Sequence, residues 1–190
     1  MTSRVHPAAA LVVVALCAAG CGADTARPAW AVLTELGRDD VPMRPGANVR
    51  LFNEVDLNAR GLVDYDTATG YLTLQPGTYR VDGWSLTTFG YELTKDEQAQ
   101  TFSAPGYAFL WNVDTERIEL LGSMQDPLYG QPSILDGIVE VPASTRYYLA
   151  HQNGRNVAGI HLQVHDPDAT MPDGSVSTNH AFARLVVEPL

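Results

Sequence analysis

The chain has 190 residues, of which 45% are hydrophobic, and a formal net charge of −10 at pH 7. This acidity argues against binding to nucleic acid, which needs a basic face, and against electrostatic docking on anionic lipid headgroups. Both cysteines, Cys17 and Cys21, lie in the first 21 residues. The remainder is long enough for one domain with a proper core, and it must fold without a disulfide.

The first 21 residues have the layout of a bacterial secretory signal. Arg4 supplies a positive charge, residues 8–19 form an uncharged apolar run, and small residues then precede Cys21. The run is shorter than the ~20 residues that a membrane-spanning helix needs. Ala19 and Gly20 fit the pocket of a signal peptidase, and the cysteine after them resembles a lipobox, in which the chain is cut before a cysteine that is then acylated. A plain signal peptide with an incidental cysteine is the alternative.

This segment predicts the cellular location of the protein and a division of the chain into three parts. We expect a lipoprotein signal peptide over 1–20, a lipidated tether over 21–29 and an ectodomain over 30–190. The mature protein would be anchored by lipid at Cys21, on the extracytoplasmic side of a bacterial cell membrane or envelope. Loss of Arg4, the one charged residue of the signal, changes the net charge from −10 to −11.

Beyond the tether, short apolar or aromatic stretches alternate with turn residues at spacings near ten residues. The predicted strands are 30–36, 48–52, 71–74, 78–89, 107–113, 117–121, 137–141, 146–151, 157–165 and 181–188. Pro45-Gly46, Pro76-Gly77 and Pro142 mark turns, and the one helix-like stretch, Lys95–Gln100, is too short to matter by itself. This pattern is typical of an all-β sandwich or barrel in a single domain.

Three segments in order along the chain carry a family resemblance. The first, 66–81, contains a Thr-Gly pair and a Pro-Gly turn before Tyr79 and a long strand. The second, 139–149, is an apolar strand, a turn and a strand of apolar-tyrosine-apolar type. The third, 181–189, brings a phenylalanine strand to the C-terminus. Together they resemble the head shared by complement component one, subcomponent q, and tumour necrosis factor.

The resemblance implies a jelly-roll β-sandwich of about ten antiparallel strands that forms a homotrimer. It also implies a protein that recognises proteins, carbohydrates or charged patterns and is not an enzyme. Two features depart from the family pattern. Arg184 stands where the family often has glycine, and the stretch 157–177 is longer than the corresponding family loop.

Aromatic residues are numerous for a sandwich of this size, and they are candidates for the core or for the trimer interface. The set comprises Trp84, Phe109, Trp111, Tyr148 and Phe182. Because side chains alternate between the two faces of a strand, Phe109 and Trp111 share one face with Tyr107. For the same reason Tyr148 and Tyr147 lie on opposite faces of their strand. Some strands therefore carry bulky side chains on both faces, as they would if one face packed the core and the other a partner.

A cation site is a weaker candidate. His161, His165, Asp166 and Asp168 supply two imidazoles and two carboxylates within eight residues, which suit calcium or another divalent cation. Strand alternation explains the same histidines, with Gln163 between them, as the solvated face of a half-buried strand. No cofactor is otherwise expected.

No catalytic constellation stands out. The chain contains the residue types of a catalytic triad in Ser144, His151 and Asp136. The Gly-x-Ser-x-Gly motif that would place a nucleophilic serine on a sharp turn is absent from the sequence. A cupin barrel is the alternative fold, since residues 136–153 have the rhythm of its second motif. Ser144 and Tyr147 stand where that motif needs glycine and histidine, and its first motif is absent.

The sequence therefore predicts a lipid-anchored recognition or interaction module, a homotrimer that binds a protein or a glycan. Loops Tyr91–Gly106 and Asp126–Ser133 are the candidate ligand contacts, because loops on a rigid scaffold commonly carry binding. The alternatives are a structural envelope lipoprotein without a soluble ligand and a cupin-like metal-dependent protein.

Overall fold

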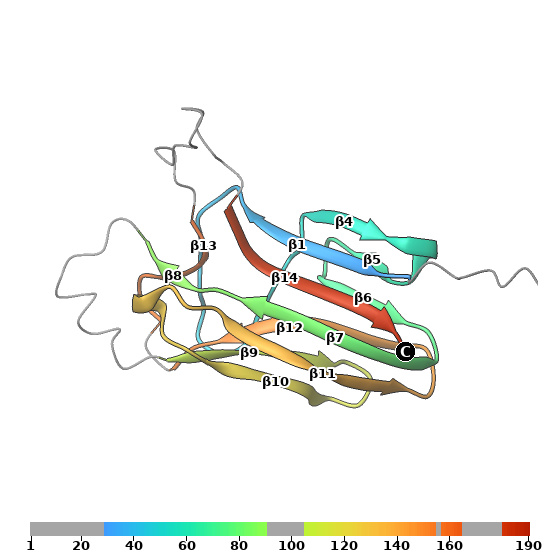
Figure 1. Ribbon diagram of the computed structural model, residues 1–190. Helices are drawn as coiled ribbons and strands as arrows, with labels where there is room; N and C mark the ends of the chain where they lie inside the picture. The colour runs from blue at the N-terminus through green and yellow to red at the C-terminus, as the bar shows by residue number, and fades with distance from the viewer. Residues whose placement is uncertain (1–28, 91–104, 155–156, 165–179) are drawn as a thin grey trace, which may run out of the picture.

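The computed structural model describes residues 29–90, 105–154, 157–164 and 180–190, which form a sandwich of two antiparallel sheets (Figure 1). The five-stranded sheet has the order β11 (Ser133–Val141), β7 (Gly77–Ser85), β14 (His180–Pro189), β1 (Ala31–Gly37), β4 (Glu54–Asn58). The six-stranded sheet has the order β10 (Arg117–Gln125), β9 (Gly106–Asn112), β12 (Thr145–Gln152), β6 (Tyr71–Leu74), β5 (Asp64–Asp66), with β3 (Asn48–Val49) also paired to β12. A small third sheet has the order β2 (Val41–Pro42), β13 (Ile160–Gln163), β8 (Thr88–Phe89).

The connectivity is that of a jelly roll. The chain passes directly from one large sheet to the other between β3 and β4, β4 and β5, β6 and β7, β10 and β11, and β11 and β12. The first and last long strands, β1 and β14, pair with each other inside the five-stranded sheet, from Ala31 opposite Val187 to Gly37 opposite His180. Two short 3-10 helices, η1 (Ala59–Gly61) and η2 (Pro127–Tyr129), lie in connections.

Strand alternation builds the core. In β7 the inward residues Tyr79, Val81 and Ser85 are buried, whereas Arg80 between them is exposed. The main cluster joins such inward residues of both sheets: Ala31, Leu33, Phe52, Val63, Leu72, Leu74, Tyr79, Val81, Ala108, Leu110, Leu135, Val139, Val141, Tyr147, Leu149, Ala183, Leu185 and Val187. Burying two facing apolar surfaces is the main source of stability in a sandwich without disulfides.

The predicted all-β jelly-roll sandwich is confirmed, with corrections to individual strands. The predicted strand 78–89 is divided into β7 and β8, and 157–165 is shortened to β13 in the third sheet. The strands β2, β4 and β5 were not predicted, because their sequences Val-Pro, Glu-Val-Asp-Leu-Asn and Asp-Tyr-Asp are short and rich in polar residues. The helix-like stretch Lys95–Gln100 lies outside the described residues. Within the described ranges, no helix has the length and apolar character needed to cross a membrane.

Candidate functional site

An aromatic row crosses the outer face of the six-stranded sheet. Tyr148 on β12 lies opposite Trp111 on β9, and its ring also contacts that of Tyr71 on β6. The ring centroids of Tyr71 and Tyr148 are 5.7 Å apart with an interplanar angle of 17°, and those of Tyr148 and Trp111 are 6.4 Å apart at 23°. Phe109 and Tyr107 continue the cluster along β9. The three rings of the row, Tyr71, Tyr148 and Trp111, are half-buried, so they are positioned by their neighbours and still reach solvent.

Charged and aliphatic side chains border this row. Arg146, two positions before Tyr148 on the same face of β12, donates from Nη2 to Asp114 Oδ1 at 2.7 Å and from its backbone nitrogen to Oδ2 at 2.8 Å. These hydrogen bonds lower the pKa of Asp114 and raise that of Arg146, so both groups stay charged near neutral pH. On the other side, β10 exposes Leu121 and Met124.

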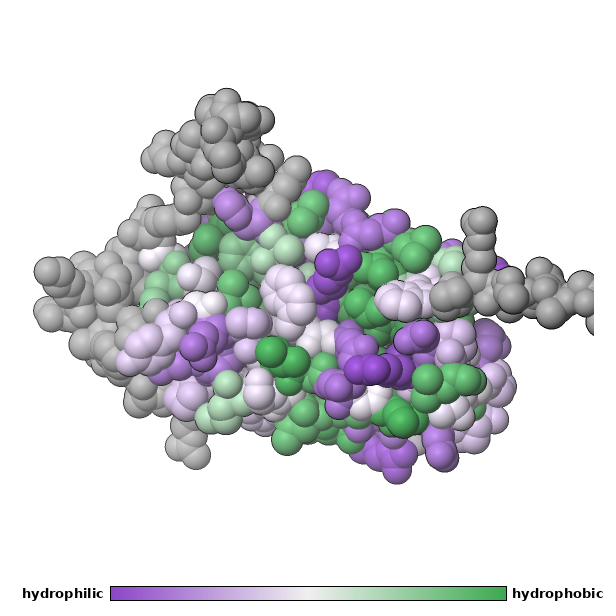
Figure 2. Space-filling model, in the orientation of Figure 1, coloured by the Kyte–Doolittle hydropathy of each residue, from purple (hydrophilic) through white to green (hydrophobic). Residues whose placement is uncertain are grey.

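The outer face of the five-stranded sheet carries a second apolar surface, here called the β11 face. Its exposed side chains are Ile134 and Ile138 on β11, at 58% and 63% of their accessible area, beside half-buried Trp84. A hollow of about 340 Å³ is lined by Trp84, Leu86, Pro132, Ile134 and Ala181. Figure 2 shows apolar patches in green interspersed with purple polar residues on the visible side of the molecule.

A pair of carboxylates interrupts this face. Asp82 on β7 lies directly opposite Asp136 on β11, and the guanidinium of Arg80 is 3.1 Å from Asp82 Oδ2 and 3.6 Å from Asp136 Oδ2. Partial desolvation, the hydrogen bond with Asp136 and the charge of that neighbour raise the pKa of Asp82, while Arg80 opposes the shift. The β11 face is therefore an apolar surface that contains an acid pair.

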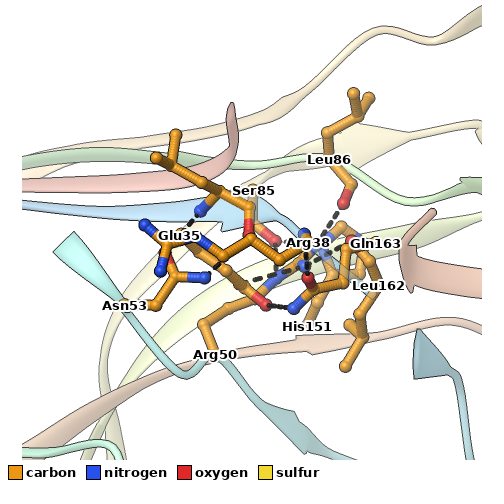
Figure 3. A network of polar contacts seen from close by, with 10 residues as sticks. Glu35, Arg38, Arg50, Asn53, Ser85, Leu86, His151, Leu162 and Gln163 are labelled. Carbon is orange, nitrogen blue, oxygen red and sulfur yellow. Dashed lines mark hydrogen bonds and ion pairs between the residues drawn. The ribbon is translucent and has the colours of Figure 1, made fainter. Parts of the chain in front are cut away.

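A polar network is enclosed where the sandwich meets the small third sheet (Figure 3). At its centre, the fully buried Arg50 donates from Nε to Ser85 Oγ at 2.8 Å and from Nη1 to the carbonyl oxygen of Leu162 at 2.7 Å. Its Nη1 also lies 3.2 Å from Glu35 Oε2, and its Nη2 donates to the carbonyl oxygen of Leu86. One side chain thus ties together β1, β7 and β13.

The same network shifts the pKa values of its members. Burial raises the pKa of Glu35 and lowers that of Arg50, and in each case the charge of the other partner opposes the shift. Glu35 also accepts a hydrogen bond from Gln163 Nε2 at 2.8 Å. A buried ion pair whose remaining atoms are hydrogen-bonded in this way keeps both charges tolerable inside the core.

His151 lies at the edge of the network. Its Nδ1 is 2.8 Å from Ser85 Oγ, which already accepts from Arg50 and can give its own proton to the ring. Nε2 is buried without a hydrogen-bond partner. Burial, together with the charge of Arg50, lowers the pKa of His151 to about 2. The imidazole is therefore neutral at physiological pH.

The serine, histidine and aspartate that have the residue types of a catalytic triad, Ser144, His151 and Asp136, are not brought together. His151 points into the core toward Ser85, whereas Asp136 lies on the outer β11 face opposite Asp82. Ser144 is in the turn before β12, seven residues from His151 along an extended strand, or about 23 Å. The pair of Ser85 and His151 is enclosed, with neither side chain exposed to solvent.

The predicted cation site falls largely outside the described residues, which leave out His165, Asp166 and Asp168. His161 is half-buried on β13, and its Nδ1 has no hydrogen-bond partner. Among the described residues, no group of three or more His, Cys, Asp or Glu side chains is arranged to hold a metal ion. One expectation is wrong: Gln163 does not lie on a solvated face but is buried against Glu35, because the third sheet packs over it.

The other predicted positions are distributed over both layers. Phe109 and Phe182 are almost completely buried, whereas Trp84, Trp111 and Tyr148 are half-buried on outer faces. Ala19, Gly20 and Cys21, most of the loop Tyr91–Gly106 and part of the stretch after Val157 lie outside the described residues. The loop Asp126–Ser133 contains η2 and exposes Tyr129.

Sequence reasoning missed the network around Arg50. Arginine is almost never fully buried unless it is paired, so the usual interpretation of Arg50 and Glu35 is a solvated one. One signal was present: each is the one charged residue of its strand candidate, 30–36 or 48–52.

The two layers, their antiparallel strand order and the central pairing of β1 with β14 define an all-β jelly-roll head. Among solved structures, the chain is similar to the globular domain of the zebrafish complement 1qA protein, with a TM-score of 0.49 and 9% sequence identity over 86% of this chain and 98% of that chain. No protein-family model and no curated protein matches the chain.

Proposed function

We propose that the chain is a lipid-anchored interaction module on the extracytoplasmic side of a bacterial membrane, and that it acts as a homotrimer that binds a protein or a glycan. The observation that carries the proposal is the exposure of apolar side chains on a rigid sheet. Ile134 and Ile138 present 58% and 63% of their accessible area on the β11 face, beside Trp84 and its apolar hollow. Ile134 lies opposite Trp84 in the pairing of β11 with β7, and exposed apolar surface of this kind is a mark of an interaction site.

The size of this face suits self-association. Five strands, spaced about 4.8 Å apart and about eight residues long, cover about 600 Å² in projection, close to the ~800 Å² that each partner buries in a stable interface. The family resemblance of the sequence supplies the three-fold symmetry. A ring of three copies also suits lipid anchoring, because one acyl chain gives marginal membrane binding and several together bind stably.

The proposal does not include catalysis. Within the described residues, the one serine–histidine pair is enclosed in the core, where no substrate reaches it. The carboxylate pair on the β11 face is neutralised in part by Arg80. An interaction role therefore accounts for the exposed surfaces, and the buried polar groups serve the fold.

Sedimentation velocity of the full chain in a density-matched detergent tests the assembly. We expect a trimer at micromolar concentration, and we expect the double variant Ile134→Ser, Ile138→Ser to dissociate it. Leu121→Ser, an equally exposed position on the other sheet, is the matched control and leaves the mass unchanged. A monomeric wild-type chain would remove the assembly from the proposal.

Incorporation of labelled palmitate tests the anchor. We expect the wild-type chain to take up label in bacterial cells and Cys21→Ala to take up none. A Cys21→Ala chain that still carries label, or a wild-type chain that never does, contradicts lipid anchoring but leaves the interaction module in place.

A further inference from the structure

The aromatic row of Tyr71, Tyr148 and Trp111 is half-buried, so part of each side chain reaches solvent. Its neighbouring rings are nearly parallel, with centroids 5.7 Å and 6.4 Å apart. Carbon atoms in contact are about 3.5–4.0 Å apart, so parallel rings at these separations are displaced sideways by about 4–5 Å and overlap only in part. The row therefore forms an overlapping platform of ring surface across three strands.

The charges around the platform fit an uncharged partner. Arg146 and Asp114 bind each other alongside the row, two positions from Tyr148 on β12, at 2.7 Å between Nη2 and Oδ1. Asp66, at the β5 edge, accepts hydrogen bonds from Ala68 and Thr69 of its own turn. Arg146, the arginine beside Tyr148, is already paired with Asp114, so an acidic partner would have to compete for it and would be repelled by a chain of net charge −10.

The polar groups that border the row disfavour a purely apolar partner. Arg146 and Asp114 keep 52% and 36% of their side-chain area exposed, and covering them with apolar surface would remove water without replacing its hydrogen bonds. A partner that combines apolar faces with hydroxyl groups can pack against the rings and also form hydrogen bonds with Arg146 and Asp114. The spacing of the rings is comparable with the length of one sugar unit in an extended chain.

From these observations we propose that the outer face of the six-stranded sheet binds a neutral glycan. The C–H faces of successive sugar rings stack on Tyr71, Tyr148 and Trp111, and hydroxyl groups exchange hydrogen bonds with Arg146 and Asp114. This inference rests on the proposed interaction function and adds the chemical class of its ligand and the residues that bind it. It places the ligand on the sheet face opposite to the β11 face, so that self-association leaves it accessible.

Affinity electrophoresis of the full chain in detergent tests the proposal directly. The gels contain one neutral polysaccharide each (hydroxyethyl cellulose, glucomannan, galactomannan, laminarin or glycol chitin) or an acidic one (alginate or hyaluronate). We expect at least one neutral polysaccharide to retard the chain and the acidic ones to leave it unretarded. Tyr148→Ala and Trp111→Ala each weaken the retardation about tenfold, because each removes one stacking surface.

Control variants separate binding from folding and from assembly. Tyr129→Ala removes an exposed aromatic ring outside the row and leaves the affinity unchanged. Tyr148→Phe and Trp111→Phe retain a ring and restore most of the retardation, whereas a general loss of folding would show in their unfolding midpoints. The double variant Ile134→Ser, Ile138→Ser lowers the apparent affinity for the polysaccharide only because the separated copies no longer bind together. Tyr148→Ala and Trp111→Ala bind more weakly than this double variant.

Three results would overturn the proposal: no retardation by any neutral polysaccharide, retention only by acidic ones, or equal losses in Tyr129→Ala and Tyr148→Ala. Retention of a protein partner through the row, without any glycan, would also overturn it. If the chain is retarded by a glycan yet sediments as a monomer, the trimer fails and the glycan site stands. If it is trimeric and no neutral glycan binds, the glycan site fails and self-association stands.

Discussion

Replacement of Arg50 by methionine removes the centre of the buried polar network. The guanidinium is fully buried and donates to Glu35, Ser85 and the carbonyl oxygens of Leu162 and Leu86. Without it, the Glu35 carboxylate keeps only the hydrogen bond from Gln163 and no opposite charge. Breaking a buried ion pair from one side costs about 3–5 kcal/mol, a large share of the ~5–15 kcal/mol by which domains are stable.

A double-mutant cycle tests whether the cost of Arg50→Met comes from leaving Glu35 as an unpaired buried charge. Glu35→Gln alone leaves a buried cation without its anion and is also destabilising. We expect the double variant Glu35→Gln, Arg50→Met to cost at least about 2 kcal/mol less than the sum of the single variants, because neither then leaves an unpaired buried charge. Arg38→Met is the matched control, since its ion pair with Glu54 is half-exposed and is worth about 1 kcal/mol or less.

Urea unfolding of the purified chains, followed by tryptophan fluorescence and circular dichroism, measures these free energies. The slopes of unfolding free energy against urea must agree among the variants for the comparison to hold. A cost below about 1 kcal/mol for Arg50→Met, or additivity of the two single variants, would refute the argument that this ion pair anchors the third sheet to the sandwich.

Three further outcomes follow from single positions. The pKa of His151 falls from 6.5 in the unfolded chain to about 2 in the fold, so its contribution to stability is present above pH 6.5 and is lost on acidification toward pH 2, by up to ~1.4 kcal/mol per pH unit. We expect His151→Asn to flatten the dependence of unfolding free energy on pH between 6.5 and 2, and an unchanged slope would contradict the buried neutral imidazole. Gly83→Ala places a methyl group 2.9 Å from the carbonyl oxygen of Arg184, so we expect urea unfolding to report a loss of about 1–3 kcal/mol, and a neutral effect would show that β7 and β14 can separate. Asp136→Asn removes the like charge beside Asp82 and should lower the pKa of that carboxyl in an NMR titration; no change would mean that desolvation alone raises it.

Part of the surface chemistry could be predicted from the sequence because it depends on alternation alone. The period of two places Tyr107, Phe109 and Trp111 on one face of β9 and separates Tyr148 from Tyr147 on β12, as the structure shows. The pattern cannot say which rings of different strands meet. That Tyr148 lies between Tyr71 and Trp111 follows from strand order and register, which depend on the whole sheet.

The polar core shows the opposite case. Glu35, Arg50, Ser85 and Gln163 are 15 to 128 positions apart in the pairs that join them, and nothing local marks them as partners. Gln163 in particular alternates with apolar residues as a solvated side chain would. Only the packing of the third sheet over the end of the sandwich buries it and supplies a carboxylate for it to contact.

The sequence by itself determined the strand periodicity, the turns and the absence of cysteine beyond Cys21, and with them an all-β sandwich without disulfides. These properties are local, because alternation and turn chemistry act over a few residues. Tertiary structure decided which faces stay exposed, which rings join into a row and which charges are enclosed with Arg50. Those features depend on contacts between strands far apart in the chain, and burial exists only once the two sheets have packed together.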